Sequence, residues 1–81
     1  MDETYIHITA SYVEGTMSDD RIYDSVGHPN SSGSGLGRRD MEWVFLSSEH
    51  VKAAETKNKL NDIPGLTVWS RTYDVNGNII T

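Results

Sequence analysis

Three histidines are the side chains of this 81-residue chain best suited to act as bases or metal ligands near neutral pH. His7, His28 and His50 are far apart in the sequence, and none lies in an H-x-x-x-H or H-E-x-x-H pattern that would place two ligands on one face of a helix. The chain has no cysteine to complete a metal site. We therefore expect neither a metal nor any other cofactor.

Residues 7–9, His-Ile-Thr, match one half of the paired H-x-T motif of two-histidine phosphoesterases. A second copy of the motif is missing, so a minor phosphoesterase that uses His7 is kept only as a second alternative. Serines are frequent, but no G-x-S-x-G sequence presents one of them as a nucleophile beside a base. We expect no catalytic residues, and hence a protein that is not an enzyme.

The segment 28–39 is rich in serine and glycine and ends in the only pair of adjacent basic residues. Glycines allow backbone N–H groups to converge on an anion, and arginines bind phosphate or carboxylate in bidentate fashion. The segment is not a P-loop, because G-x-G-x-G at 33–37 lacks the Lys-Ser/Thr ending. One interpretation is a flexible connector with solvated arginines, and the other is a contact with an anionic ligand or a partner protein. The predicted contact residues are Arg21, Ser32, Gly33, Ser34, Gly35, Gly37, Arg38 and Arg39.

The charge balance limits the partners, since 12 acidic residues face 7 basic ones and the net charge is −5. Duplex nucleic acid is a poor partner for such a chain, because binding it requires a basic surface that displaces counterions. The early cluster of acids is typical of a solvated surface, with mimicry of nucleic acid as the alternative interpretation. No hydrophobic run is long enough for a membrane span, and no signal peptide is visible after the acidic start, so we expect a cytoplasmic protein without a membrane partner.

Hydrophobic periodicity predicts three strands and two helices. Alternating residues predict the strands, and an i, i+4 apolar spacing with Ser caps and Gly or Pro stops predicts the helices. The Asn76-Gly77 pair is a type I′ turn signal that could return the chain as a brief fourth strand. The predicted elements are strands at 4–13, 40–47 and 66–73, helices at 18–27 and 48–63, a long Ser/Gly-rich loop at 28–39, and a C-terminal hairpin or tail at 74–81.

The order of these elements predicts a single domain over residues 1–81 of the α+β class. Two helices, one of them short, cannot cover both faces of a doubly wound sheet. The order resembles the ferredoxin-like split β-α-β arrangement, with a reduced three- to four-stranded antiparallel sheet and both helices on one face. The loop at 28–39 stands where the second strand of that fold would lie, and the resemblance carries no function.

One face of this sheet is expected to carry an apolar patch that faces away from the helices. Such a patch on a small domain without disulfides favours a homodimer or higher oligomer formed sheet to sheet. The alternatives are a cover formed by the chain's own tail or loop, and a stacking platform for single-stranded RNA that uses Trp69, Tyr73, Tyr5 and Arg71. The predicted oligomer interface comprises Tyr5, His7, Val44, Leu46, Trp69, Arg71 and Tyr73.

Together these patterns predict a small, non-enzymatic regulatory or inhibitory binding protein, of which a phage-type inhibitor of a host system is one example. The expected partners are a second copy of the chain and either a partner protein or a small phosphate-bearing ligand, contacted through the segment 28–39. A single-stranded nucleic-acid binder is the first alternative.

Overall fold

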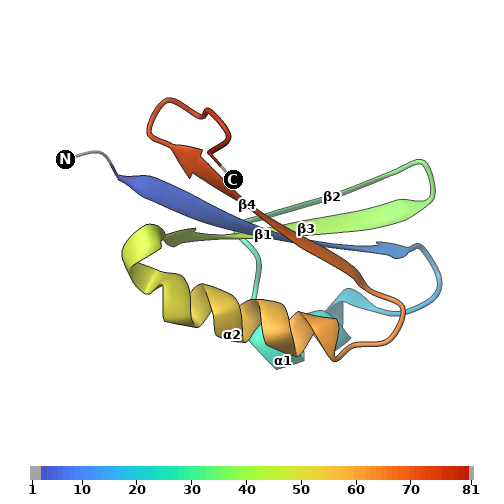
Figure 1. The fold of residues 1–81 in the computed structure, drawn as a ribbon. Coiled ribbons are helices and arrows are strands. Elements are labelled where there is room, and N and C mark those ends of the chain that lie inside the picture. Colours follow the sequence, from blue (N-terminus) through green and yellow to red (C-terminus); the bar gives the residue numbers. More distant parts are fainter. Residues whose placement is uncertain (1–2, 81) are drawn as a thin grey trace.

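The computed structural model describes residues 3–80 and has the predicted α+β class, with a four-stranded antiparallel sheet and two α-helices (Figure 1). Helix and strand boundaries lie within about two residues of those predicted from periodicity, as expected of frayed ends. In chain order the elements are β1 (Thr4–Val13), α1 (Asp19–Val26), β2 (Ser31–Gly35), β3 (Arg38–Leu46), the 3₁₀ turn η1 (Ser47–Glu49), α2 (His50–Asn61) and β4 (Thr67–Asp74). No helix within residues 3–80 is long and apolar enough to cross a membrane.

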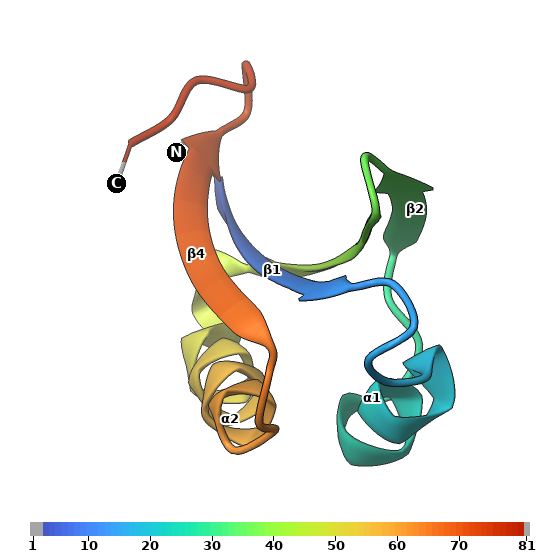
Figure 2. The same ribbon diagram turned by 90° about the vertical axis from the view of Figure 1, so that its right-hand side faces the viewer.

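The strands lie in the order β2-β3-β1-β4, and every neighbouring pair is antiparallel. The first strand is therefore central and pairs with β3 on one side and with β4 on the other. Both helices cover the same face of the sheet (Figure 2). At the two edges, β2 and β4 curve away from the helices, so the opposite face of the sheet is concave (Figure 2).

The hydrophobic core lies between the sheet and the two helices, and its members follow the predicted period of two along the strands. Ile22 of α1 and Leu60 of α2 are fully buried, and Trp43 of β3 belongs to the same core. This confirms the predicted helix-facing side of the sheet. The buried apolar residues are Ile8, Ala10, Tyr12, Ile22, Met41, Trp43, Ala53, Leu60 and Ile63.

The segment 28–39 is not the long loop that its composition predicts, because residues 31–35 form strand β2 and pair with β3. A two-residue turn joins the strands, and its residues Leu36 and Gly37 both have left-handed backbone, with φ of 54° and 77°. Two left-handed residues define the type I′ geometry, whose twist matches that of the flanking strands. Composition missed β2 because Ser and Gly have low strand propensity, and here β3 supplies the hydrogen-bonding ladder.

The chain after β4 also differs from the type I′ hairpin predicted at Asn76-Gly77. Only Gly77 has a positive φ, of 84°, while the Asp74 carboxylate accepts hydrogen bonds from the backbone N–H of Asn76 and of Asn78, both at 2.9 Å. The side chain of Asp74 thus closes the turn in place of a left-handed asparagine. The predicted fourth strand is reduced to a single bridge between Tyr73 and Ile79.

Candidate functional site

Strand β2 and the turn that joins it to β3 are the most exposed part of the sheet. All five residues of β2 are exposed, and none of them carries a charge. The outer edge of β2 has no neighbouring strand within the described chain. At the tip, Leu36 combines a fully exposed side chain with the left-handed backbone of the turn.

The two arginines at the start of β3 point to opposite faces of the sheet, as consecutive strand residues must. The Nε of Arg38 donates to the Oγ of Ser11 at 2.9 Å on the concave face, where Ser11 is buried. Arg39 lies on the helix side and pairs with Asp19 of α1, with 2.5 Å between Nη2 and Oδ2. The structure therefore does not bring the arginine pair together as one anion clamp, and Arg21 lies exposed on α1.

Asp19 is the centre of a polar network, whereas sequence reasoning treated the early acids as a solvated surface. Its carboxylate accepts hydrogen bonds from Arg39 and from the hydroxyls of Tyr12 and Tyr23. The guanidinium of Arg39 is the main cause that lowers the pKa of Asp19, whereas burial is the main cause that raises the pKa of Tyr12. The network ties α1 to the base of the hairpin and so fixes the direction in which the hairpin projects. Pattern reasoning missed it because the partners lie 20 residues apart.

The concave face carries the predicted interface residues. His7 of β1 is central there, with its Nδ1 3.2 Å from the Oε1 of Glu42 and its ring 4.4 Å from that of Tyr73 in an edge-to-face arrangement. Trp69 and Leu46 are 38% and 39% exposed, at opposite edges of this group. The other predicted members are Tyr5, Val44 and Tyr73, which are half-buried, and Arg71, which is exposed.

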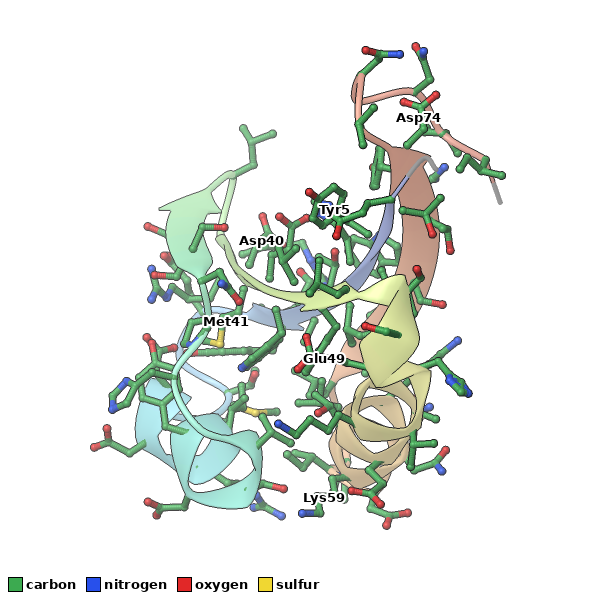
Figure 3. All side chains as sticks on the ribbon, turned by 90° about the vertical axis from the view of Figure 1, so that its left-hand side faces the viewer. Tyr5, Asp40, Met41, Glu49, Lys59 and Asp74 are labelled. Carbon is green, nitrogen blue, oxygen red and sulfur yellow. The ribbon has the colours of Figure 1, made fainter. Side chains whose placement is uncertain are left out.

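Two carboxylates of β3 lie on this concave face as well, because they alternate with the buried Met41 and Trp43, and sequence reasoning did not include them in the site. Figure 3 labels one of them, Asp40. Asp40 and Glu42 line a cavity of about 210 Å³ together with the hydroxyls of Thr9 and Ser31. Because carboxylates repel phosphate groups, this arrangement argues against the single-stranded nucleic-acid alternative. The Nδ1 of His7 faces one of these carboxylates, that of Glu42. In the described part of the chain, no three His, Asp or Glu side chains are grouped so as to hold a metal ion.

A larger cavity, of about 460 Å³, opens on the helix side beside the start of β2. Val26, Trp43 and Phe45 are among its apolar lining residues, and most of the others are polar, including His28 and Asn30 just before β2. Lys52 and Lys59 of α2 line the far side; Figure 3 shows α1 and α2 as separate columns beneath the sheet, with Lys59 on α2. The cavity arises because α1 has only eight residues and leaves part of the sheet uncovered. No periodicity in the sequence signals such a space.

The fold and the hairpin together define a small α+β protein with an exposed strand edge. Comparison with known proteins found no matching protein family, no matching curated protein and no matching solved structure.

Proposed function

We propose that this chain is a non-enzymatic regulatory or inhibitory binding protein that works as a homo-oligomer and makes its contacts through the β2–β3 hairpin. The observation that carries the proposal is Leu36, a fully exposed leucine held in left-handed backbone at the hairpin tip. The concave face is accessory to this contact.

Leucine at position 36 is unfavourable for the stability of the free chain. A left-handed residue that is not glycine costs about 1–2 kcal/mol, and asparagine or glycine is the preferred first residue of a type I′ turn. Full exposure means that the leucine gains nothing from burial within its own chain. A residue that is unfavourable in the free protein at the end of a projecting hairpin is well explained as an anchor that is buried in a partner.

The uncharged β2 edge supports a protein partner over a phosphate-bearing ligand. An exposed strand edge binds other chains by adding a strand, and small side chains on the edge leave the backbone groups accessible. Arg39, half of the proposed anion clamp, is already paired with Asp19. We therefore narrow the partner to a protein chain, a second copy of this one included.

The shape of the sheet favours an oligomer that forms through the edge and not through the face. Two concave surfaces placed together leave a void, whereas close packing is what stabilises an interface. Tyr5, His7 and Tyr73 moreover make contacts within the chain, with Glu3, Glu42 and one another. The exposed members of the predicted interface are Leu46, Trp69 and Arg71.

We also propose that the fold is ferredoxin-like. Counted from its β4 edge, the strand order is β4-β1-β3-β2. Each central strand is followed by a helix and then by a strand at the far side of the other central strand, which is the split β-α-β connection. This proposal concerns architecture and adds nothing about function.

The variant Leu36→Asn tests the proposed function, because it removes the anchor and at the same time suits the turn. We expect thermal stability to stay equal or to rise, and self-association in sedimentation equilibrium to weaken at least tenfold. Val75→Asn, which replaces an exposed valine in the turn after β4, is the matched control and should associate like the unchanged protein. An unchanged protein that is monomeric at every concentration, or oligomers that survive Leu36→Asn, would overturn the proposal.

A further inference from the structure

Resting on the proposed function, we infer that the homo-oligomer is a closed two-fold dimer in which β2 pairs antiparallel with β2 of a second copy, and Leu36 of each copy seats at the helix-side cavity of the other. The argument uses the free edge, the direction of its backbone groups and the position of that cavity.

Within the described chain the β2 edge is open along its whole length, whereas the β4 edge is covered at its C-terminal end. On the other edge, the residues after the Asp74 turn run back along β4, where the N–H of Ile80 donates to the carbonyl of Thr72 at 2.7 Å and Ile79 bridges to Tyr73. The charge distribution of the protein also favours association through β2. A chain with a net charge of −5 repels its copies over most of its surface, but β2 is uncharged along its whole length.

The two-residue turn fixes which groups of β2 face outward. In such a hairpin the residues that flank the turn, Gly35 and Arg38, form a hydrogen-bonded pair, and bonded pairs recur at every second position of the ladder. Gly33, opposite Asp40, is then bonded inward as well. Ser32 and Ser34 direct their N–H and C=O groups toward the outer edge, where they are available to a second chain.

These outward groups select one register. When Ser32 of each copy pairs with Ser34 of the other, all five residues of β2 are opposite a residue of the second β2, and Gly33 lies on the two-fold axis facing its own copy. Directly opposed residues of a non-bonded antiparallel pair have Cα atoms about 4.5 Å apart, and glycine accepts this close approach. The pairing uses both β2 edges and cannot extend further, so the assembly closes as a dimer.

The same register carries Leu36 to the cavity. Leu36 follows the last paired residue, in the turn, and so lies near the start of β2 of the second copy, where Asn30 and His28 line the 460 Å³ cavity. Val26 and Phe45 offer apolar contacts to the leucine side chain in a cavity whose other lining residues are mostly polar. The strand pairing thus provides geometry, and the two leucine anchors provide the apolar burial that an edge of five residues lacks.

Cysteine cross-linking tests the register, since the chain has no cysteine of its own. We expect Gly33→Cys to form a disulfide-linked dimer under mild oxidation, because the two Cα atoms lie within the range of about 4.4–6.8 Å that a disulfide requires. A Cβ at Gly33 or at Gly35 meets no atom within 4 Å in the free chain, so both substitutions fit the fold. Gly35→Cys alone should not cross-link, because the two copies of residue 35 are offset by about 13 Å along the strands. A mixture of Gly35→Cys with Ser31→Cys should form the mixed dimer.

The variant Ser32→Pro adds a test without oxidation. Its N–H faces outward in this register, so proline should leave the thermal midpoint nearly unchanged and weaken dimerisation at least tenfold in sedimentation equilibrium. An oligomeric protein in which Gly33→Cys fails to cross-link, or in which Gly35→Cys cross-links equally well, overturns this dimer and leaves the proposed function standing. A protein that is monomeric at every concentration overturns both. If Ser32→Pro does not fold, the cross-linking pattern alone decides.

Discussion

The two edges of the sheet are treated very differently by the same chain. Beyond β4, the Asp74 turn and the bridge from Ile79 return the chain along the outer strand. Beyond β2 no strand follows, and the edge itself consists of serine and glycine. Natural sheets commonly shield their edges with charges, prolines or covering segments. The returning chain shields the end of the β4 edge, at residues 72–74, whereas the β2 edge is bare along its whole length and ends in an exposed leucine.

This difference teaches that the exposed segment is a hydrogen-bonded strand and not the loop that its composition predicts. The base of the hairpin is fixed to α1 through Arg39 and Asp19, and to β1 through Arg38 and Ser11. A surface held this way loses little conformational freedom when it binds, which favours association. The predictions below separate the contributions of the two edges, beginning with a change that affects both.

The largest effect is expected from Leu60→Ala, which removes a fully buried side chain of α2. Loss of a buried leucine leaves a cavity and should lower the free energy of unfolding by about 3 kcal/mol. Because the whole core unfolds together, hydrogen exchange should accelerate equally at β2 and at β4. Urea unfolding measures the first quantity, and Val51→Ala, an exposed site on the same helix, is the matched control. Protection lost at one edge alone would contradict a single cooperative unit.

A smaller and local effect is expected from Asp19→Asn. It weakens the pairing with Arg39 and the hydrogen bonds from Tyr12 and Tyr23, and should cost about 1–2 kcal/mol. Hydrogen exchange should accelerate at β2 and at the start of β3 while β4 stays protected. Asp20→Asn is the control, because Asp20 is the exposed neighbour on the same helix. Equal losses of unfolding free energy in the two variants would show that Asp19 stabilises the fold through the helix dipole and not through the network.

The same carboxylate makes part of the stability depend on pH. The pKa of Asp19 is lowered in the folded protein, mainly by the hydrogen bond from Arg39. Its contribution is therefore complete above the unfolded pKa, about 3.9, and is lost as the pH falls through the lower folded value. We expect the difference in unfolding free energy between the unchanged protein and Asp19→Asn to shrink as the pH falls below about 4. A difference that is constant down to strong acid would contradict this assignment.

The smallest effect is expected at the shielded edge from Asp74→Ala. The pKa of Asp74 is lowered first by the backbone N–H of Asn78 and also by that of Asn76, so the carboxylate organises the turn. Its removal should release the Ile79–Ile80 return and raise hydrogen exchange along β4. The thermal midpoint should fall by less than it does in Asp19→Asn. Asn76→Ala keeps the carboxylate and is the control. If β4 then acts as a second open edge, larger oligomers should appear in light scattering.

Much of the fold could be predicted from the sequence because its elements have strong local signals. Alternation at Ile6, Ile8 and Ala10 places β1 with the correct face toward the helices, and the spacing of Ala53 and Leu60 places α2. Strand β2 could not be predicted in this way, because its pairing with β3 and not its composition makes it a strand. The candidate site was also predicted only in part. The sequence identified the segment 28–39 as unusual, but it wrongly predicted that the two arginines act together.

By itself, therefore, the sequence determined the fold class, the apolar face of each strong element and the singular character of the Ser/Gly segment, because all three depend on residues close together in the chain. The tertiary structure alone decided that Arg38 and Arg39 diverge, that Asp19 meets Arg39, and that β2 forms a bare edge beside a cavity. Each of these depends on contacts between residues far apart in the chain, and such contacts leave no periodic trace in the order of the amino acids.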